Sequence, residues 1–263
     1  MGEEQSVSTD LPAPVKALNT ASGLSWWPVL LFLPTRLVFA FVAQGLVAGI
    51  FALRGSGEPM NAAAAWWPVY STITDVLCLI ALAWLTRREG ISIVELFGVR
   101  GKAALRQLVW IPVYLLAVAP GAVLANVITR AYYGSALPPF LAVVDLPLGG
   151  VVYSLAVWPL IWSITEELVY LGFLLPRLEA MSGKTWLAIL VVIFFWGLQH
   201  LAMPVLADST YLVSRVLAAW FAISLFPVVF AFWGRRLIPL IAIHYLIDLT
   251  TAFLVGVMPL IRE

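Results

Sequence analysis

Long apolar segments, separated by short polar links, make up most of the chain. About 20 helical residues span the roughly 30 Å hydrocarbon core of a bilayer, and seven segments reach that length. We expect membrane spans at Trp26–Leu53, Trp66–Leu85, Leu108–Ile128, Gly150–Leu175, Trp186–Met203, Tyr211–Trp233 and Leu237–Leu260. The pattern predicts an all-α polytopic membrane helix bundle, with an eighth span as the alternative count.

Polar stretches divide this bundle. Residues 1–24 lack the basic start and short apolar core of a signal peptide, so we expect a retained, disordered cytoplasmic tail. Residues 25–149 carry the first helices and a basic cytoplasmic loop at 86–107, and residues 150–260 carry the second helical part. Within that loop, the mixed apolar and charged segment Ile91–Gln107 suits an interfacial helix on anionic lipid or, equally, a solvated loop.

Positively charged residues are distributed unevenly between the two sides of the predicted membrane. The loops of one side hold Arg87, Arg88, Arg100, Lys102, Arg106, Arg177, Lys184, Arg235 and Arg236, whereas the other side has Arg54, Arg130 and Arg262. Cytoplasmic loops carry the Lys and Arg excess, so we expect a cytoplasmic amino terminus. Short loops and the lack of organelle signals favour a bacterial plasma membrane.

The amino-acid composition agrees with an integral membrane protein. Hydrophobic residues make up 62% of the chain and charged residues 11%, against about 45–50% and about 25% in soluble domains. A net charge of +1 argues against a nucleic-acid partner, which requires a clustered basic surface. The single cysteine, Cys78, excludes a disulfide within the chain and a metal site built on cysteines.

Several ionisable side chains interrupt the predicted spans. They are Arg36, Asp75, Glu166, Glu167, His200, Arg215, His244 and Asp248. Each charge at mid-membrane costs about 2.5–3.5 kcal/mol on insertion scales, so such residues indicate a functional site by default. His244 and Asp248 are four apart and share a helix face, whereas the adjacent Glu166 and Glu167 point about 100° apart. Arg36 and Asp75 we interpret as structural, either paired with each other or snorkelling.

A carboxylate with two imidazoles suits hydrolysis. The carboxylate can act as general base on a water molecule, while the imidazoles orient that water and stabilise an oxyanion. The same three groups could instead hold zinc with one open position, although the HExxH pattern is absent. Both interpretations stay open at this point.

Three short motifs carry a family resemblance. Glu166–Leu178, with the sequence EELVYLGFLLPRL, resembles the Glu-Glu-x-x-x-Arg motif of the CPBP family of intramembrane proteases, which includes type II CAAX prenyl endopeptidases and bacterial Abi proteins. Trp196–His200 resembles the second motif, an aromatic residue followed four positions later by His, and His244–Asp248 resembles the third. The motifs keep the family's order within Gly150–Val257.

The resemblance implies an intramembrane endopeptidase of the glutamic type. Glu166 would activate water, His200 would help to hold it, and Glu167 would support the pair. His244 and Asp248 would bind the oxyanion, with Asp248 either protonated or orienting His244. We expect no metal or other cofactor, although zinc remains an alternative.

One position departs from the family pattern. Leu171 occupies the place of the motif's arginine, which supports the glutamate pair, while Pro176–Arg177 is kept. The loss implies a different support, reduced activity or a divergent subfamily. Trp196, where Phe is usual, we interpret as a minor change.

Partners and competing functions follow from these observations. We expect membrane lipid and a membrane-associated or C-terminal-tail peptide substrate as partners, prenylated or not. A non-catalytic scaffold or immunity protein of the same fold is the first alternative. A proton-coupled transporter is the second, suggested by prolines inside the spans but not by any internal repeat.

Overall fold

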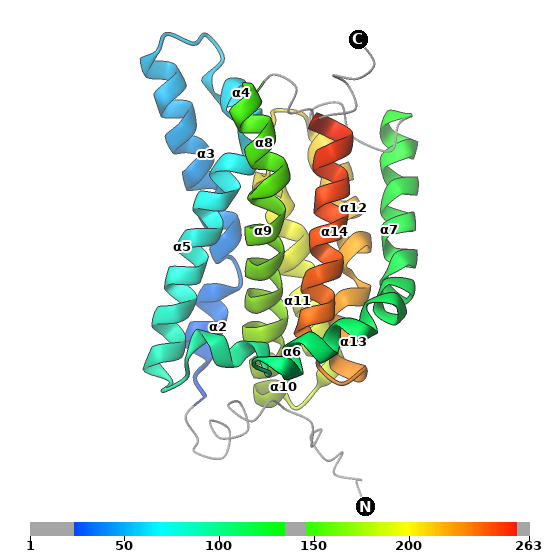
Figure 1. Ribbon diagram of the computed structural model, residues 1–263. Helices are drawn as coiled ribbons and strands as arrows, with labels where there is room; N and C mark the ends of the chain where they lie inside the picture. The colour runs from blue at the N-terminus through cyan, green and yellow to red at the C-terminus, as the bar shows by residue number, and fades with distance from the viewer. Residues whose placement is uncertain (1–23, 135–145, 257–263) are drawn as a thin grey trace, which may run out of the picture.

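The computed structural model describes residues 24–134 and 146–256, and these residues form helices without any strand (Figure 1). In this described part of the chain, seven helical stretches are long and apolar enough to cross a membrane. They run over Trp26–Leu53, Trp67–Arg88, Ile93–Tyr133, Leu148–Ser182, Thr185–Ala202, Ser209–Phe232 and Leu237–Leu254. The chain is a multi-pass membrane protein, and the predicted all-α bundle is confirmed. Most of the predicted tail, and the last residues of the seventh predicted span, lie outside the described residues.

The helices stand side by side, and their bounds follow the predicted spans closely. The first half contains α2 (Trp26–Phe32), α3 (Thr35–Leu53), α4 (Pro59–Ala64), α5 (Trp67–Arg88), η1 (Ile93–Phe97), α6 (Lys102–Gln107), η2 (Leu108–Trp110) and α7 (Ile111–Tyr133). The second half contains α8 (Leu148–Ala156), α9 (Trp158–Glu167), η4 (Leu168–Leu174), α10 (Leu175–Ser182), α11 (Thr185–Leu198), η5 (Gln199–Ala202), α12 (Ser209–Ile223), α13 (Leu225–Phe232) and α14 (Leu237–Gly256).

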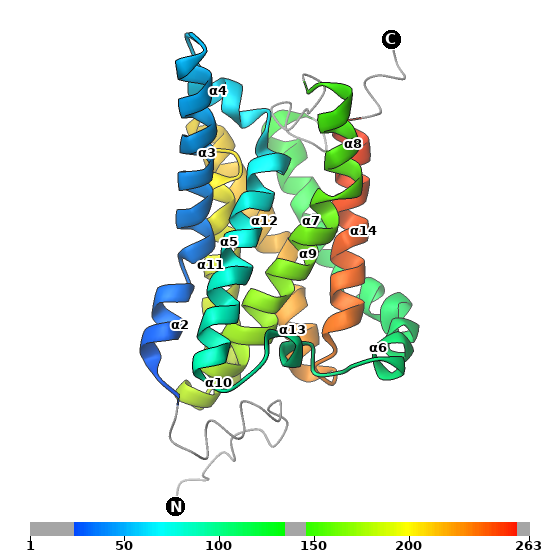
Figure 2. The same ribbon diagram turned by 60° about the vertical axis from the view of Figure 1, so that its left-hand side comes forward.

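Prolines divide three of the spans. α2 and α3 meet at a bend beside Pro34, which Figure 2 shows as a change of direction. α9 starts just before Pro159, and α13 starts two residues before Pro227. Proline has no N–H to donate to the preceding turn, so the helix ladder is interrupted near each of these residues. Pro120, by contrast, stays inside α7.

The fourth span changes its helix type directly after the glutamate pair. Leu168–Leu174 form a π-helix, η4, between α9 and α10. π-Helical turns are rare and are frequently found at functional sites. All residues of η4 are buried, and Tyr170, Leu171 and Phe173 have no exposed surface.

The segment predicted as an interfacial helix or a solvated loop is mostly helical. η1, α6 and η2 form the first part of the third helical stretch, before α7, and α6 runs across the end of the bundle in Figure 1. Ser92 begins η1 with a capping box to Glu95, and Gly98 ends it in the left-handed conformation. Contact of this segment with lipid stays a prediction.

Two ion pairs tie the helix ends together at the same end of the bundle. Arg177 donates to the carboxylate of Glu89 just beyond α5, and Arg235 Nη2 lies 2.7 Å from Glu179 Oε2. The prediction that Arg177 belongs to a loop is wrong, because the fourth span continues to Ser182 and buries this side chain.

Small residues allow two close helix contacts. A Cβ on Gly121 of α7 would meet the backbone oxygen of Phe221 in α12 at 2.5 Å. A Cβ on Gly197 of α11 would lie 1.7 Å from the Trp220 ring, whose Nε1 donates to Phe194 O at 3.0 Å. These contacts fix α12 between α7 and α11 and so define one wall of the site.

Candidate active site

Glu166 is fully buried near the end of α9 and accepts hydrogen bonds from three side chains. Arg36 Nη2 donates to Oε1 at 3.0 Å, and Gln199 Nε2 donates to the same oxygen. The indole Nε1 of Trp196 donates to Oε2. Charge-assisted hydrogen bonds of this kind hold a carboxylate in one orientation. Glu166 is therefore a fixed group rather than a mobile one.

Arg36 joins the first, second and fourth spans. Its guanidinium pairs with Asp75 of α5 and with Glu166, and its Nε donates to Gln199 Oε1 at 2.6 Å. The same guanidinium lies 5.0 Å from the centre of the Trp162 ring. The predicted pairing of Arg36 with Asp75 is confirmed. Its contact with Glu166 was not anticipated, and it supplies the positive partner that Leu171 cannot provide.

Leu171 itself packs in the apolar core. Its side chain has no exposed surface and belongs to the same cluster as Val169, Phe173 and Val192. Because η4 is a π-helix, the spacing of residues after Glu167 does not follow an α-helical wheel. Arg36 thus gives Glu166 a different support, the first of the possibilities raised by the sequence.

The second glutamate holds an imidazole. His244 Nδ1 of α14 lies 2.9 Å from Glu167 Oε1 and 3.0 Å from Oε2. Its Nε2 lies 3.3 Å from Asp248 Oδ2 and 3.8 Å from Glu166 Oε2. The two glutamates, which point in different directions on α9, therefore meet the same histidine from two sides.

His200 lies in η5, at the end of the fifth span. Its Nδ1 is 3.1 Å from Trp196 O, so a proton on Nδ1 would be donated to that carbonyl and leave Nε2 as an acceptor. Its ring is 6.2 Å from that of Trp162. No described hydrogen bond joins His200 to a carboxylate of the cluster, and the residue instead lines the cavity in front of Glu166.

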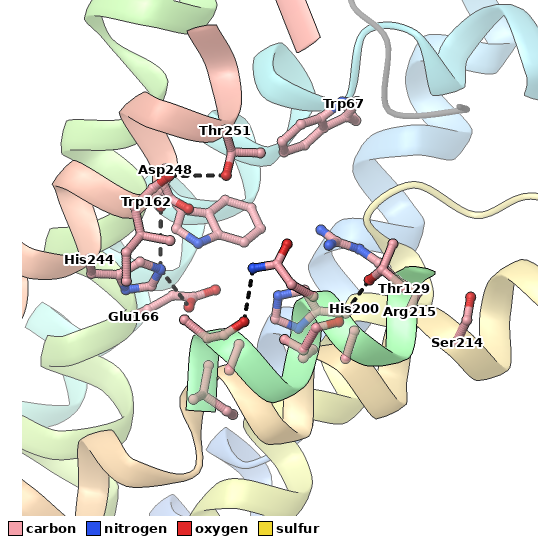
Figure 3. Close-up of a pocket in the computed structure, with 18 of the residues that line it drawn as sticks. Trp67, Thr129, Trp162, Glu166, His200, Ser214, Arg215, His244, Asp248 and Thr251 are labelled. Carbon is pink, nitrogen blue, oxygen red and sulfur yellow. Dashed lines mark hydrogen bonds and ion pairs between the residues drawn. The ribbon is translucent and has the colours of Figure 1, made fainter. Parts of the chain in front are cut away.

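A cavity of about 190 Å³ brings these residues together. Its lining includes Glu166, His200, His244 and Asp248, and Figure 3 shows them around one space. Glu167 lies behind His244 and is fully buried. The five residues singled out from the sequence thus come from three spans to one place, four of them at the cavity and one supporting it.

The positions of the possible ligand atoms decide whether the site could hold a metal ion. Within residues 24–134 and 146–256, no group of three or more His, Cys, Asp or Glu side chains is arranged to hold a metal ion. Both ring nitrogens of His244 already face carboxylates, and His200 Nδ1 faces a backbone carbonyl. We therefore derive no chemical step through zinc.

Sequence reasoning overlooked three contacts of Glu166. Trp196 was interpreted as a minor change, yet its indole N–H, which Phe lacks, donates to the carboxylate. Gln199 was not singled out, although its place beside His200 was a usable signal. Arg36 was noticed as an intramembrane charge but was paired only with Asp75.

Comparison with known protein families gives one match. Residues 147–250 match the model of the family described as type II CAAX prenyl endopeptidase Rce1-like. This range contains all three motifs, and it agrees with the resemblance to the CPBP family, a family of CAAX-type intramembrane proteases. Comparisons with curated proteins and with solved structures found no match.

Proposed function

We propose that this chain, whose residues 147–250 match the Rce1-like CAAX endopeptidase family, is an intramembrane endopeptidase of the glutamic type. The observation that carries the proposal is the shared cavity of Glu166, His200, His244 and Asp248. A carboxylate that is fixed near two imidazoles at a cavity large enough for water has the parts required for hydrolysis of a peptide bond.

In the proposed reaction, Glu166 accepts a proton from water while the water oxygen forms a bond to the peptide carbonyl carbon. The carbonyl oxygen becomes an oxyanion, which a protonated Asp248 and a His244 imidazolium, donating from Nε2 while Nδ1 donates to Glu167, would stabilise with hydrogen bonds. Glu166 then returns the proton to the leaving nitrogen as the C–N bond breaks, so that a carboxylic acid and an amine are formed. His200 would hold the water through its free ring nitrogen.

The remaining residues of the site hold Glu166 and His244 in position. Glu167 accepts from His244 Nδ1 and thereby directs Nε2 toward the reacting oxygen. Arg36, Gln199 and Trp196 keep Glu166 from rotating. Because Arg36 takes the place of the absent motif arginine, Leu171 is not an argument for a non-catalytic scaffold.

Purified protein in lipid nanodiscs and a fluorogenic peptide ending in a membrane-anchored tail provide the test. We expect cleavage by the wild type and a loss of at least about 100-fold in kcat for Glu166→Gln and His200→Gln. Glu95→Gln, an exposed carboxylate of η1, is the matched control and should keep full activity. Cleavage that is unchanged in both site variants would contradict the proposal.

A second set of experiments tests the zinc mechanism and the non-catalytic scaffold. Cleavage should persist after dialysis against a chelator, and loss with recovery on added Zn²⁺ would favour the metal mechanism instead. A protein that binds the peptide without cleaving it would favour the scaffold. The proposal includes a cytoplasmic amino terminus, which cysteine labelling from either side of a vesicle can test.

A further inference from the structure

His200 lies on a short turn that is followed by irregular chain. η5 is a 3₁₀-helix, and residues 203–208 connect it to α12 without regular helix. A 3₁₀ turn has poorer hydrogen-bond geometry than an α-helix, so the position of His200 depends on contacts from outside the turn. Buried backbone groups in the connection likewise require partners from elsewhere in the fold.

Gln44 of α3 binds both backbone groups of one residue in this connection. Its Nε2 donates to Val205 O at 2.9 Å, and its Oε1 accepts from Val205 N at 2.7 Å. The side-chain amide thus pairs with Val205 in the way a neighbouring β-strand would. Gln44 has no exposed surface and lies 161 positions before its partner. A buried amide is costly unless it is paired, and here both its donor and its acceptor are used.

Tyr70 of α5 joins the second span to the same contact. Its hydroxyl donates to Gln44 Oε1 at 3.1 Å and lies 3.5 Å from Ala202 O, at the end of η5. The tyrosine side chain is fully buried. The chain that leaves η5 is therefore bound by polar groups from the first two spans.

One helix, α3, holds the His200 turn on both sides. Before His200, Arg36 Nε donates to Gln199 Oε1 at 2.6 Å. After His200, Gln44 pairs with Val205. Arg36 and Gln44 both lie on the buried face of α3, about 12 Å apart along the helix at about 1.5 Å per residue. His200 thus lies between two points that the first span fixes.

His200 has little direct support of its own. Its Nδ1 faces Trp196 O at 3.1 Å, and its ring lies 6.2 Å from the Trp162 ring. Among the described residues, no side chain forms a hydrogen bond with His200, whereas Glu167 binds His244 directly. The place of the His200 ring in the cavity therefore depends on where its backbone is held.

We propose that Gln44 is a positioning residue, which fixes the connection after η5 and thereby holds the His200 imidazole at the cavity in front of Glu166. Tyr70 supports Gln44 in this role. The catalytic consequence rests on the proposed endopeptidase function, whereas the effect on the His200 ring does not. Misplacement of a reacting group by about 1 Å can lower a rate about 100-fold, so a remote hydrogen bond of this kind matters for turnover.

Magnetic resonance of the histidine rings tests the positioning without any cleavage. His200 and His244 are the two histidines of the chain, so full-length protein labelled with ¹⁵N in its histidines gives ring signals from these two residues alone. His200→Gln assigns the signals by removing one set. Gln44→Met keeps the length of the side chain without its amide, and it should shift or broaden the His200 signals while those of His244 stay unchanged. Tyr70→Phe should change the same signals to a smaller extent.

Tyr114→Phe is the matched control, because it removes another buried hydroxyl that donates to a backbone carbonyl, that of Trp233. Both histidine rings should keep their signals in this variant. Unchanged His200 signals in Gln44→Met would overturn the inference. Equal changes of both rings would also overturn it, because they would show a general loosening of the bundle. If Gln44→Met does not fold, Tyr70→Phe decides by the same two criteria.

Peptide cleavage in nanodiscs measures the catalytic consequence. Gln44→Met should lower kcat roughly 10- to 100-fold and change KM less than about threefold, because the reacting groups and not the binding surface are displaced. In the His200→Gln protein the same substitution should lower kcat less than about twofold, because the group that Gln44 positions is already absent. An equal loss in both backgrounds would overturn the inference. A response of the His200 signals in a protein that cleaves no peptide would support the positioning role and contradict only the endopeptidase proposal.

Discussion

Glu167 Oε1 lies 2.9 Å from Nδ1 of His244, across the contact of α9 with α14. The opposite ring nitrogen faces Asp248 at 3.3 Å. One carboxylate thus sets the orientation of an imidazole whose other edge faces the cavity, and it holds a proton on Nδ1.

Replacing this carboxylate tests its part in the site. Glu167→Gln keeps the shape but offers His244 Nδ1 a neutral amide, which can donate as well as accept. We expect kcat to fall roughly 10- to 1,000-fold with KM changed less than about twofold, because a neutral amide no longer stabilises the doubly protonated ring that the proposed reaction requires. Peptide cleavage in nanodiscs provides the measurement. A change confined to KM would contradict a role in the chemical step.

The indole N–H of Trp196 provides a narrower test. Trp196→Phe removes the donor to Glu166 but keeps an aromatic ring against Tyr170, on which the indole stacks at 4.9 Å. A hydrogen bond to a charged group contributes about 1.5–3 kcal/mol, so kcat should fall about 10- to 100-fold. Trp186→Phe, at an exposed site, is the control. Full activity of Trp196→Phe would show that the bond is dispensable.

Arg36 should affect both stability and activity. Arg36→Met leaves Asp75 and Glu166 as buried, unpaired carboxylates, and removal of one partner from a buried ion pair costs about 3–5 kcal/mol. We expect a lower thermal unfolding midpoint in detergent and a loss of cleavage. Arg36→Lys should unfold at a higher temperature than Arg36→Met, because the positive charge remains. It should stay less active than the wild type, because lysine lacks the forked guanidinium that contacts both carboxylates. Arg54→Gln, at the exposed end of the first span, should match the wild type.

Leu171 offers the complementary test. Inserting the family arginine by Leu171→Arg would bury a charge among apolar side chains with Arg36 already in place. We expect lower stability and no gain in cleavage, because the position lies in the packed core around η4. The double variant Arg36→Leu with Leu171→Arg should not recover activity. A large increase in activity for Leu171→Arg alone would mean that the native site is impaired.

Much of the fold could be predicted from the sequence because membrane spans depend on length and hydrophobicity alone. The span Trp26–Leu53 agrees with the structure at both ends. The third and fourth spans extend beyond the prediction. In the fourth span, Arg177 remains helical because the carboxylate of Glu89 neutralises its charge. A polar end of a helix cannot be told from a loop by hydrophobicity.

The residues of the candidate site could be predicted from the sequence, but the contacts between them could not. Glu166, His200 and His244 stand out because intramembrane ionisable residues are costly. Their partners depend on how the spans pack, which residue spacing does not reveal. Arg36 and Glu166 are 130 positions apart, and the contact between them follows from the meeting of α3, α5 and α9 around Gln199. Because η4 is a π-helix, the Glu-Glu-x-x-x-Arg spacing also does not predict which side of the helix each residue faces.

The pairing of Arg36 with Asp75 has a consequence for biosynthesis. Both residues belong to the first two spans, so a nascent helical hairpin can carry its two charges as a neutral pair before the rest of the chain is made. Glu166 arrives only with the fourth span, and it finds a cation that is already held in place within the bilayer. The order of synthesis thus delays the assembly of the proposed hydrolytic centre until the fourth span has joined the first two.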